Sequence, residues 1–427
     1  MNASTSKLFQ SLTLPNGQTI PNRLCKAAME ENLCDEGQIP GDRLHQLYRS
    51  WVEGGVGLIL TGNVMVAPDA LTGPGGVVLQ ESNDIEPFKR WAKFGKPEDG
   101  QLWMQINHPG RQVYTAMGET ALSPSDKALD MGKLSKMFAQ PRAMTEEEIE
   151  VLIQRFVATS KQAESAGFTG VQVHAAHGYL ISQFLSPLTN LRSDQWGGDI
   201  NNRSRILIEI VKRIRQSVKP EFCVSVKLNS ADFQKGGFDL NDAKAVIQLL
   251  NELGVDLVEL SGGSYESPAM QGRVSEKEGE KTERTLRREA YFVDFAREIA
   301  SVAIMPIMVT GGILRRAVAE EALEKDSAGF GVEMLGIAQA LAFQPDLPKQ
   351  WQKDELEIKL PQVNWKNKTF AALAVMAVTK AQLNRLALGK SPKANISPFF
   401  SLIADQIKTS QRTKRYRRWR NNLAQAV

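Results

Sequence analysis

Two histidines and a tyrosine lie close together in the segment VQVHAAHGYL, at His174, His177 and Tyr179. Two neutral imidazoles can donate hydrogen bonds to one carbonyl oxygen, which polarises the carbonyl and stabilises developing enolate charge. A phenol beside them can then deliver a proton. The chain holds only four histidines, so we interpret this cluster as catalytic rather than as packing histidines beside a core tyrosine.

A metal ion is the competing interpretation of His174 and His177. Zinc usually takes three or four protein ligands. Histidines are scarce, and no cysteine or acidic cluster ends a neighbouring apolar segment. We therefore predict no metal site. The three cysteines, Cys25, Cys34 and Cys223, are far apart and are typical of reduced structural thiols in a cytoplasmic protein.

Two more polar side chains lie near the ends of apolar segments. Lys227 closes the segment FCVSVK, where an ammonium is costly unless it meets an anion. The negative N1–O2 edge of a reduced flavin would be such a partner, and the alternative is a lysine that extends to solvent. Gln105 lies in QLWMQIN, and its amide can donate and accept, which matches the edge of a flavin pyrimidine ring.

Eight apolar segments alternate with helix-like stretches, as in parallel strands buried on both faces. Eight units predict an α/β fold that closes into a (β/α)₈ TIM barrel, with the active site at the carboxyl ends of the strands. The predicted strands cover 24–29, 56–62, 101–107, 170–175, 222–228, 256–262, 305–312 and 329–337. The predicted helices include 146–167, with Thr145 as N-cap, 202–218, 241–253, 287–301 and 315–325.

Two appendages flank the predicted barrel. Asn16 and Gly17 favour a tight turn, so we expect an N-terminal hairpin that caps the barrel. The barrel should occupy residues 1–355. Residues 356–427 should form a C-terminal helical extension with helices at 369–389 and 397–411 and a basic tail.

Glycines end the seventh predicted strand, at Gly311 and Gly312. In barrels this region often binds phosphate through backbone N–H groups. Glycine permits the close approach that such binding needs, although it also commonly ends strands. The pair is therefore a candidate phosphate site.

The composition is that of an ordinary globular protein, with 42% hydrophobic and 23% charged residues. No apolar run approaches the roughly 20 residues that span a bilayer, and no secretory signal is visible. The net charge is +4, yet seven basic and no acidic residues lie after residue 407, so the rest of the chain carries −3. We predict a cytoplasmic protein without membrane contact.

The chain resembles the Old Yellow Enzyme family of NAD(P)H:flavin oxidoreductases. The resemblance runs from PNRL (21–24) to PDLP (345–348), about three quarters of the chain. Its most specific parts are HAAHGYLISQFLSP (174–187) and the following N-x-R-x-D-x-WGG run (190–198). QINHPGR (105–111) and VTGGI (309–313) add to it.

The resemblance implies an enzyme that uses flavin mononucleotide (FMN), with NADH or NADPH as reductant. NAD(P)H would pass hydride to FMN and leave, and an α,β-unsaturated carbonyl or nitro compound would then bind in its place. His174 and His177 would hold the oxygen of this alkene, and Tyr179 would protonate the α-carbon. The expected reaction is thus a ping-pong reduction of activated C=C bonds.

The resemblance also assigns residues to FMN. Ala28 and Met29 would lie against the flavin, Asn63 would touch it, and Gln105 would bind its ring. Lys227 takes the place of a basic residue at N1–O2 that is usually arginine. The phosphate would be bound by Gly311, Gly312, Ala338 and Gln339.

Three departures from the family pattern stand out. Glu30 occupies a position beside the flavin where threonine or cysteine is common. Gln339 occupies a position where an arginine commonly meets the phosphate, so backbone N–H groups would carry more of the binding. The C-terminal 70 or so residues have no counterpart in short family members.

Several alternatives stay open at this level. A family member could act oxidatively or demethylate an amine or natural product. From other classes, the chain could be a flavin-binding interaction protein or a metal-dependent hydrolase on the same barrel. The basic tail QRTKRYRRWRN (411–421) could cross to a partner subunit of a homo-oligomer, remain a solvated end, or contact nucleic acid or an anionic membrane. We favour the homo-oligomer and consider nucleic acid unlikely.

Overall fold

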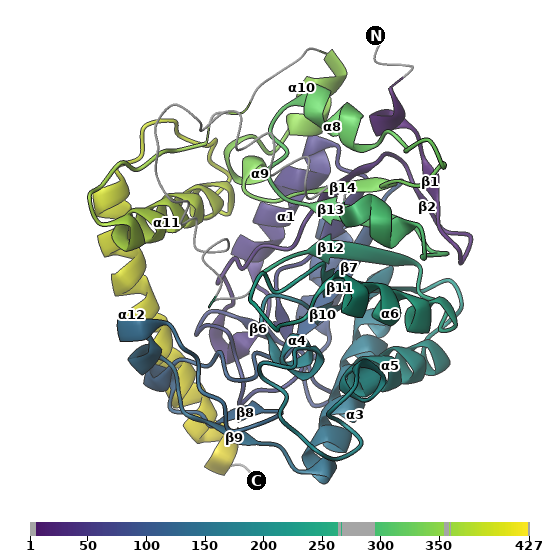
Figure 1. Ribbon diagram of the computed structural model, residues 1–427. Coiled ribbons are helices and arrows are strands. Elements are labelled where there is room, and N and C mark those ends of the chain that lie inside the picture. Colours follow the sequence, from purple (N-terminus) through teal and green to yellow (C-terminus); the bar gives the residue numbers. More distant parts are fainter. Residues whose placement is uncertain (1–5, 264–265, 267–294, 354–357, 359, 426–427) are drawn as a thin grey trace.

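Eight parallel strands close into a barrel (Figure 1) in the computed structural model, which describes residues 6–263, 266, 295–353, 358 and 360–425. The strands pair in the order β10-β11-β12-β13-β14-β3-β4-β7, and β7 pairs again with β10 to close the ring. Their bounds are β3 Leu24–Lys26, β4 Leu58–Leu60, β7 Gln101–Asn107, β10 Gly170–Ala175, β11 Cys223–Asn229, β12 Leu257–Ser261, β13 Ile307–Thr310 and β14 Met334–Ile337. The prediction of a TIM barrel is confirmed, and each predicted strand overlaps an observed one.

Helices cover the outside of the barrel between successive strands (Figure 1). They are α1 Asp42–Gly54, α2 Glu86–Gly95, α3 Glu146–Ser165, α5 Ile200–Ser217, α6 Leu240–Asn251 and α8 Arg316–Ala322. The short α4 Leu180–Leu185, between β10 and α5, is buried along its whole length. Thr145 caps α3 as predicted, because its side chain accepts from the Glu148 N–H while the Glu148 carboxylate accepts from the Thr145 N–H. The predicted helix 287–301 lies outside the described residues up to 294, and residues 295–300 are helical.

One predicted strand begins too early. The expected strand 329–337 starts only at Met334, because the chain before it turns back on itself. The N–H groups of Ala328 and Phe330 both donate to the Asp326 carboxylate. Such local side-chain bonds compete with strand pairing.

Several short strands lie outside the closed ring of eight strands. The predicted N-terminal hairpin is present as β1 Leu12–Thr13 and β2 Thr19–Ile20, and its leucines pack into the apolar lower interior beside Trp103 and Met334. β5 Val64–Met65 pairs with β7 beyond β4, so β4 and β5 run along the same neighbour, and β6 Val77–Val78 pairs with β5. β8 Ala121–Ser123 and β9 Pro141–Ala143 form a separate pair.

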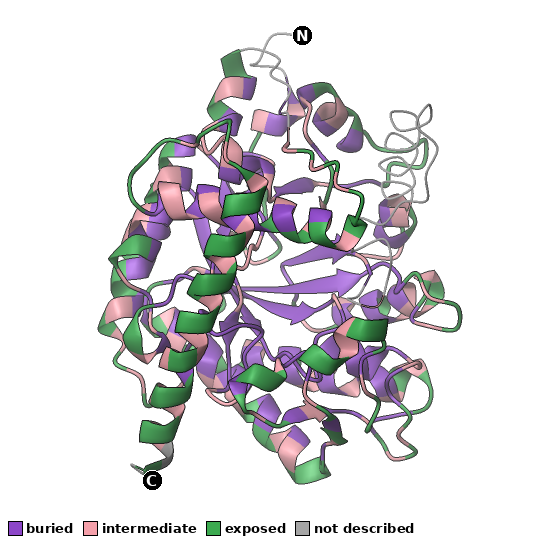
Figure 2. Cartoon of the chain, turned by 90° about the vertical axis from the view of Figure 1, so that its left-hand side faces the viewer, coloured by how far each residue is buried: buried purple, intermediate pink, exposed green. Residues whose placement is uncertain are grey.

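The C-terminal extension is helical, as expected, and packs against its own barrel (Figures 1 and 2). It follows α9 Ala340–Phe343 and α10 Leu347–Lys353 and consists of α11 Lys368–Leu386 and α12 Pro398–Gln425. The domain boundary predicted at 355/356 falls outside the described residues. In residues 6–425, as far as the structure describes them, no helix has both the length and the hydropathy to cross a membrane.

The basic tail is part of α12, which continues well past the predicted end at residue 411. Tyr416 is fully buried, and its hydroxyl lies 3.0 Å from the Pro68 carbonyl and from the Glu119 carboxylate. Arg420 also pairs with Glu119, at 2.9 Å, and Arg415 donates to the Cys34 carbonyl. Arg415, Tyr416 and Arg420 thus bind loops of the same chain's barrel, so the interpretations of the tail as a solvated end and as an arm that crosses to a partner subunit are both wrong for these side chains.

Candidate active site

The two histidines and the tyrosine meet at the carboxyl end of β10. His174 lies on the strand, His177 follows it, and Tyr179 is the N-cap residue of α4. The His174 ring lies 5.1 Å from the His177 ring and 4.9 Å from the Tyr179 ring, and both pairs are nearly perpendicular. The structure therefore brings together the three residues that the sequence predicted to be catalytic.

The backbone at His177 adopts a left-handed conformation, with φ at 61°, which is uncommon for a residue with a side chain. Side chains from β11 and from the loop after β7 stabilise it. Asn229 accepts the His177 N–H at 3.1 Å, and Gln112 donates to the carbonyl oxygens of His177 and Gly178. This turn aims the second imidazole back toward the first.

His174 is buried and His177 is partly buried, and desolvation is the main cause that holds the pKa values of both well below the ordinary 6.5. The charge of Lys227 lowers both pKa values further. His174 Nδ1 accepts the Ala176 N–H at 3.2 Å, so the proton of its neutral ring lies on Nε2. His177 Nε2 lies 2.6 Å from the Ser261 hydroxyl. The lowered pKa values favour neutral imidazoles, each of which keeps one N–H that can donate to a carbonyl oxygen.

Lys227 is buried and does not extend to solvent. Its Nζ lies 2.7 Å from Glu259 Oε1, and its side chain is only 4% exposed. The anion that we expected beside Lys227 is therefore the Glu259 carboxylate of the same chain. Gln105 is 2% exposed and donates to Gln172, so both predicted flavin-binding side chains belong to a buried polar layer.

Sequence reasoning gave no role to several residues of this layer: Gln112, Gln172, Asn229, Glu259 and Ser261. A signal existed for Glu259, because a carboxylate within the apolar segment DLVELSG is as conspicuous as Lys227 in FCVSVKL. The other four have no comparable sequence signal. Their contacts depend on the register between strands.

The candidate flavin-lining residues after β3 and β4 are partly exposed. Ala28, Met29 and Glu30 follow β3, and the Glu30 carboxylate accepts from the Thr72 hydroxyl at 2.6 Å. Asn63 lies in the break between β4 and β5. Its amide oxygen is buried and has no hydrogen-bond partner among the described residues.

The candidate phosphate site lies after β13 and β14. Gly311 and Gly312 are exposed, with φ values of 148° and 65°, and a Cβ at Gly311 would meet no described atom within 4 Å. Ala338 and Gln339 follow β14. The Gln339 amide donates to the Thr379 hydroxyl of α11 at 2.8 Å, so the C-terminal extension contacts the position at which the sequence lacks the expected arginine.

These features fit a flavin nucleotide at the mouth of the barrel. The Asn63 oxygen is a buried acceptor that needs a donor. The open glycine pair can present backbone N–H groups to an anion. Polar amides near the opposite strands match the edge of a flavin ring.

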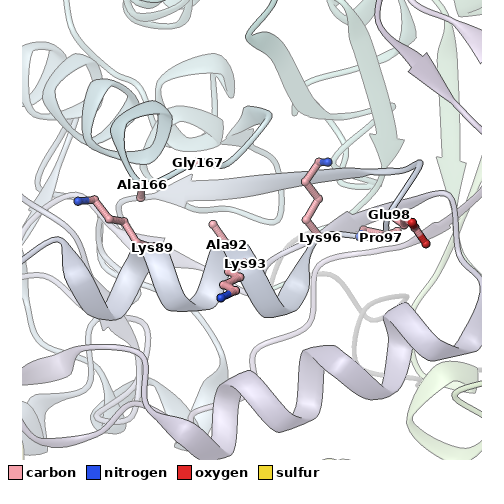
Figure 3. Close-up of a pocket in the computed structure, with 8 residues that line it drawn as sticks. All are labelled: Lys89, Ala92, Lys93, Lys96, Pro97, Glu98, Ala166 and Gly167. Atoms are coloured by element: carbon pink, nitrogen blue, oxygen red, sulfur yellow. The ribbon is translucent and has the colours of Figure 1, made fainter.

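A surface hollow outside the barrel does not compete with this site. It is lined by Lys89, Lys93 and Lys96 of α2 and its end, together with Pro97, Glu98 and the Ala166–Gly167 turn (Figure 3). These residues precede β7 and β10 and therefore lie toward the amino ends of the strands, opposite the usual active-site face. Figure 3 also shows the three lysine side chains pointing in different directions, so they do not converge on one ligand.

Comparison with known proteins agrees with the geometry. The family model described as the NADH:flavin oxidoreductase / NADH oxidase family matches residues 7–357. An NADH-dependent flavin oxidoreductase, iliE of Hypocrea jecorina (strain QM6a), is 36% identical over 355 residues, or 79% of this chain and 87% of that protein. The NADH oxidase of Thermoanaerobacter brockii is 32% identical over 333 residues, or 78% of this chain and 48% of that one.

Solved structures share the barrel. A 2-naphthoyl-CoA reductase in complex with 2-naphthoyl-CoA superposes with a TM-score of 0.67 at 25% identity, over 81% of this chain and 52% of the other. Morphinone reductase also gives a TM-score of 0.67, over 84% of this chain and 93% of the other, but at 22% identity this likeness shows the fold alone. The chain thus spans about half the length of some of these proteins.

The family model covers more than four fifths of the chain, including every candidate site residue. The match agrees with the barrel and with the cluster of histidines and tyrosine at its mouth. The chain therefore belongs to the NADH:flavin oxidoreductase / NADH oxidase family, the family of the Old Yellow Enzyme homologues, and is an enzyme.

Proposed function

We propose that this enzyme is an FMN-dependent NAD(P)H oxidoreductase that reduces activated C=C bonds of α,β-unsaturated carbonyl or nitro compounds. The observation that supports this most is the pair of imidazoles with lowered pKa values, 5.1 Å apart, beside the Tyr179 ring. Neutral donors paired with a phenol suit an oxygen that gains negative charge next to a carbon that gains a proton.

FMN, when bound, supplies the transfer of hydride from NADH or NADPH to the alkene. We assign its ring to Ala28, Met29, Glu30 and Asn63 on one side of the barrel mouth and to Gln105 and Lys227 on the other. We assign its phosphate to Gly311, Gly312, Ala338 and Gln339. Because Gln339 carries no charge, the backbone N–H groups of the glycine pair would provide most of the phosphate binding.

The catalytic roles follow from the side chains. His174 donates from Nε2 to the carbonyl or nitro oxygen, since its Nδ1 is occupied by the Ala176 N–H. His177 acts as the second donor, oriented by Asn229 and Gln112. Tyr179 delivers the proton to the α-carbon. One mouth serves both the nicotinamide and the alkene in turn, which implies ping-pong kinetics.

The surroundings of His174 and His177 do not favour a hydrolytic metal site. Lys227 is close enough to lower the pKa of both rings, and a positive charge at this place opposes the binding of a metal cation. The polar groups that contact the rings are the Ala176 N–H and the Ser261 hydroxyl, which favour a polar organic ligand. That the enzyme works in the cytoplasm remains a prediction.

Anaerobic spectroscopy tests the function. The purified protein should be yellow, should bleach with NADH or NADPH, and should regain its colour when an enone or a nitroalkene is added. A colourless protein that takes up no FMN contradicts the assignment. A flavoprotein that is reduced by NAD(P)H but is reoxidised by none of these alkenes contradicts the substrate class while leaving the family intact.

We also propose that a second copy of the chain packs against the C-terminal extension. Eight of the fourteen large hydrophobic residues that are exposed in the described part of the chain lie between residues 370 and 407. On α12 they form one ridge, Phe399, Phe400, Ile403 and Ile407, with 42–70% of each residue exposed. Exposed apolar ridges of this kind mark interfaces, and a single helix face can pair with its own copy across a two-fold axis.

Changing Phe400 to glutamate is expected to convert the oligomer to monomers in sedimentation experiments, because it places a charge at the centre of the ridge. Phe330→Glu, at an exposed phenylalanine far along the chain from α12, is the control and should keep the parent's mass. A parent protein that sediments as a monomer contradicts this interface.

A further inference from the structure

A line of hydrogen bonds crosses four neighbouring strands beneath the proposed ring site. Gln105 Nε2 donates to Gln172 Oε1 at 2.8 Å. Gln172 Nε2 donates in turn to Glu259 Oε2 at 2.9 Å. Lys227 Nζ donates to the other oxygen of Glu259 at 2.7 Å. A single carboxylate therefore joins the two side chains assigned to the polar edge of the flavin.

This arrangement follows from strand register. Gln105 lies directly opposite Gln172 in the β7–β10 pair, and Lys227 lies directly opposite Glu259 in the β11–β12 pair. None of the four residues is more than 3% exposed. The lower barrel interior holds an apolar cluster that includes Leu58, Leu60, Trp103, Leu257, Met308 and Met334, so the carboxylate has no aqueous route on that side.

The direction of each bond is fixed by the chemistry of Glu259. A carboxylate only accepts hydrogen bonds, so Gln172 must turn its NH₂ group toward it. The Gln172 oxygen then faces Gln105 and accepts from the NH₂ group of that amide. As a result the Gln105 oxygen is directed to its free side, where it can accept from a ring N–H.

At the other end of this line of hydrogen bonds, the Glu259 carboxylate also offsets the positive charge of Lys227. The Lys227 ammonium lies against Glu259, so the pair presents a dipole rather than a bare positive charge. Without Glu259 the field of the ammonium at the barrel mouth would be uncompensated, because few mobile ions or waters can screen a group that is 4% exposed.

From these contacts we infer that Glu259 is a positioning residue of the flavin site, which orients the Gln105 amide through Gln172 and limits the positive field of Lys227. The inference rests on the proposed function, since it needs FMN at the barrel mouth. Glu259 itself touches neither substrate nor reacting atoms in this assignment. Its effect is exerted on the midpoint potential and affinity of the bound FMN.

Glu259→Gln removes the negative charge and lets residue 259 both donate and accept. We expect a more positive FMN midpoint potential, because the uncompensated ammonium stabilises the charge that reduction adds. We also expect FMN affinity to fall roughly tenfold, the value of about one hydrogen bond, because the Gln172 and Gln105 amides are no longer held in one orientation. Lys227→Met should shift the potential in the opposite direction, since it leaves the carboxylate alone.

The matched control is Asp256→Asn on the approach to the same strand. Asp256 is also buried and accepts the Val224 N–H at 2.7 Å, but it lies at the amino end of β12, away from the mouth. This variant should lose stability without changing the FMN potential. If Glu259→Gln shifts the potential no further than Asp256→Asn does, the role of Glu259 is contradicted.

Removal of one partner from a buried ion pair can prevent folding, so the double variant Lys227→Met/Glu259→Gln is included. It leaves no unpaired charge, and its potential should return toward that of the parent while its FMN affinity remains reduced. A double variant that binds FMN as tightly as the parent contradicts the orienting role. A parent that binds no FMN contradicts the proposed function and this inference together, whereas equal potentials and affinities in an FMN-loaded series contradict only this inference.

Discussion

Replacing His174 or His177 with alanine is expected to slow reoxidation of the reduced enzyme by an enone by roughly 10²-fold or more, the usual loss for one preorganised donor. His174 is buried and His177 is partly buried, and desolvation lowers the pKa of both, so each can donate as a neutral ring to the oxygen that it would bind. Stopped-flow measurement of the two half-reactions separates this effect from hydride delivery by NAD(P)H. FMN content should stay near that of the parent.

His45→Ala provides the control, because His45 is a buried histidine on α1 that packs against Phe94 outside the barrel. It should leave the reoxidation rate unchanged. The parent's rate should also show no step near pH 6.5, since burial lowers the pKa of both catalytic histidines well below that value. If both alanine variants are reoxidised as fast as the parent, the two histidines are structural.

The fold could be predicted from the sequence because its signals are local. Each barrel strand is an apolar run bounded by turns, and the Asn16–Gly17 pair by itself indicates the N-terminal hairpin. The catalytic cluster was predictable for the same reason, as His174, His177 and Tyr179 lie within six residues. Residues that are close in sequence at the end of one strand are also close in space.

The polar layer below the site could not be predicted in this way. Lys227 and Glu259 are 32 residues apart, and Gln105 and Gln172 are 67 residues apart. Which residues pair depends on the strand register, because a shift of one residue moves every side chain of a strand to the other face of the sheet. The sequence pattern predicts that these strands are adjacent but does not specify which residues lie opposite each other.

The length of the C-terminal helix α12 was underpredicted for a related reason. Residues 412–420 are so basic that they resemble a solvated end. The helix is stabilised there by distant partners, since Tyr416 and Arg420 both contact Glu119 and Arg415 contacts Cys34. A carboxylate about 300 residues away in the chain gives the basic segment a binding site on its own barrel.

Replacing Tyr179 with phenylalanine is expected to reduce alkene turnover by roughly 10²–10⁴-fold, the range for loss of a general acid. The ring contact with His174, at 4.9 Å and nearly perpendicular, is available to phenylalanine as well. The substitution therefore removes the hydroxyl while preserving the packing that orients the histidine. Reduction of the flavin by NAD(P)H requires no proton from this group and should proceed at the parent's rate.

Tyr416→Phe tests whether the effect is specific to this hydroxyl. Its phenol is also buried, and it binds Pro68 and Glu119 on the outer side of the barrel loops. That variant should lose about 1 kcal/mol of stability and keep the parent's turnover. A Tyr179→Phe enzyme that reduces enones at the parent's rate would mean that the proton comes from another donor, such as water. The two histidines would then remain the oxygen-binding pair, because their hydrogen-bonding capacity does not depend on the phenol.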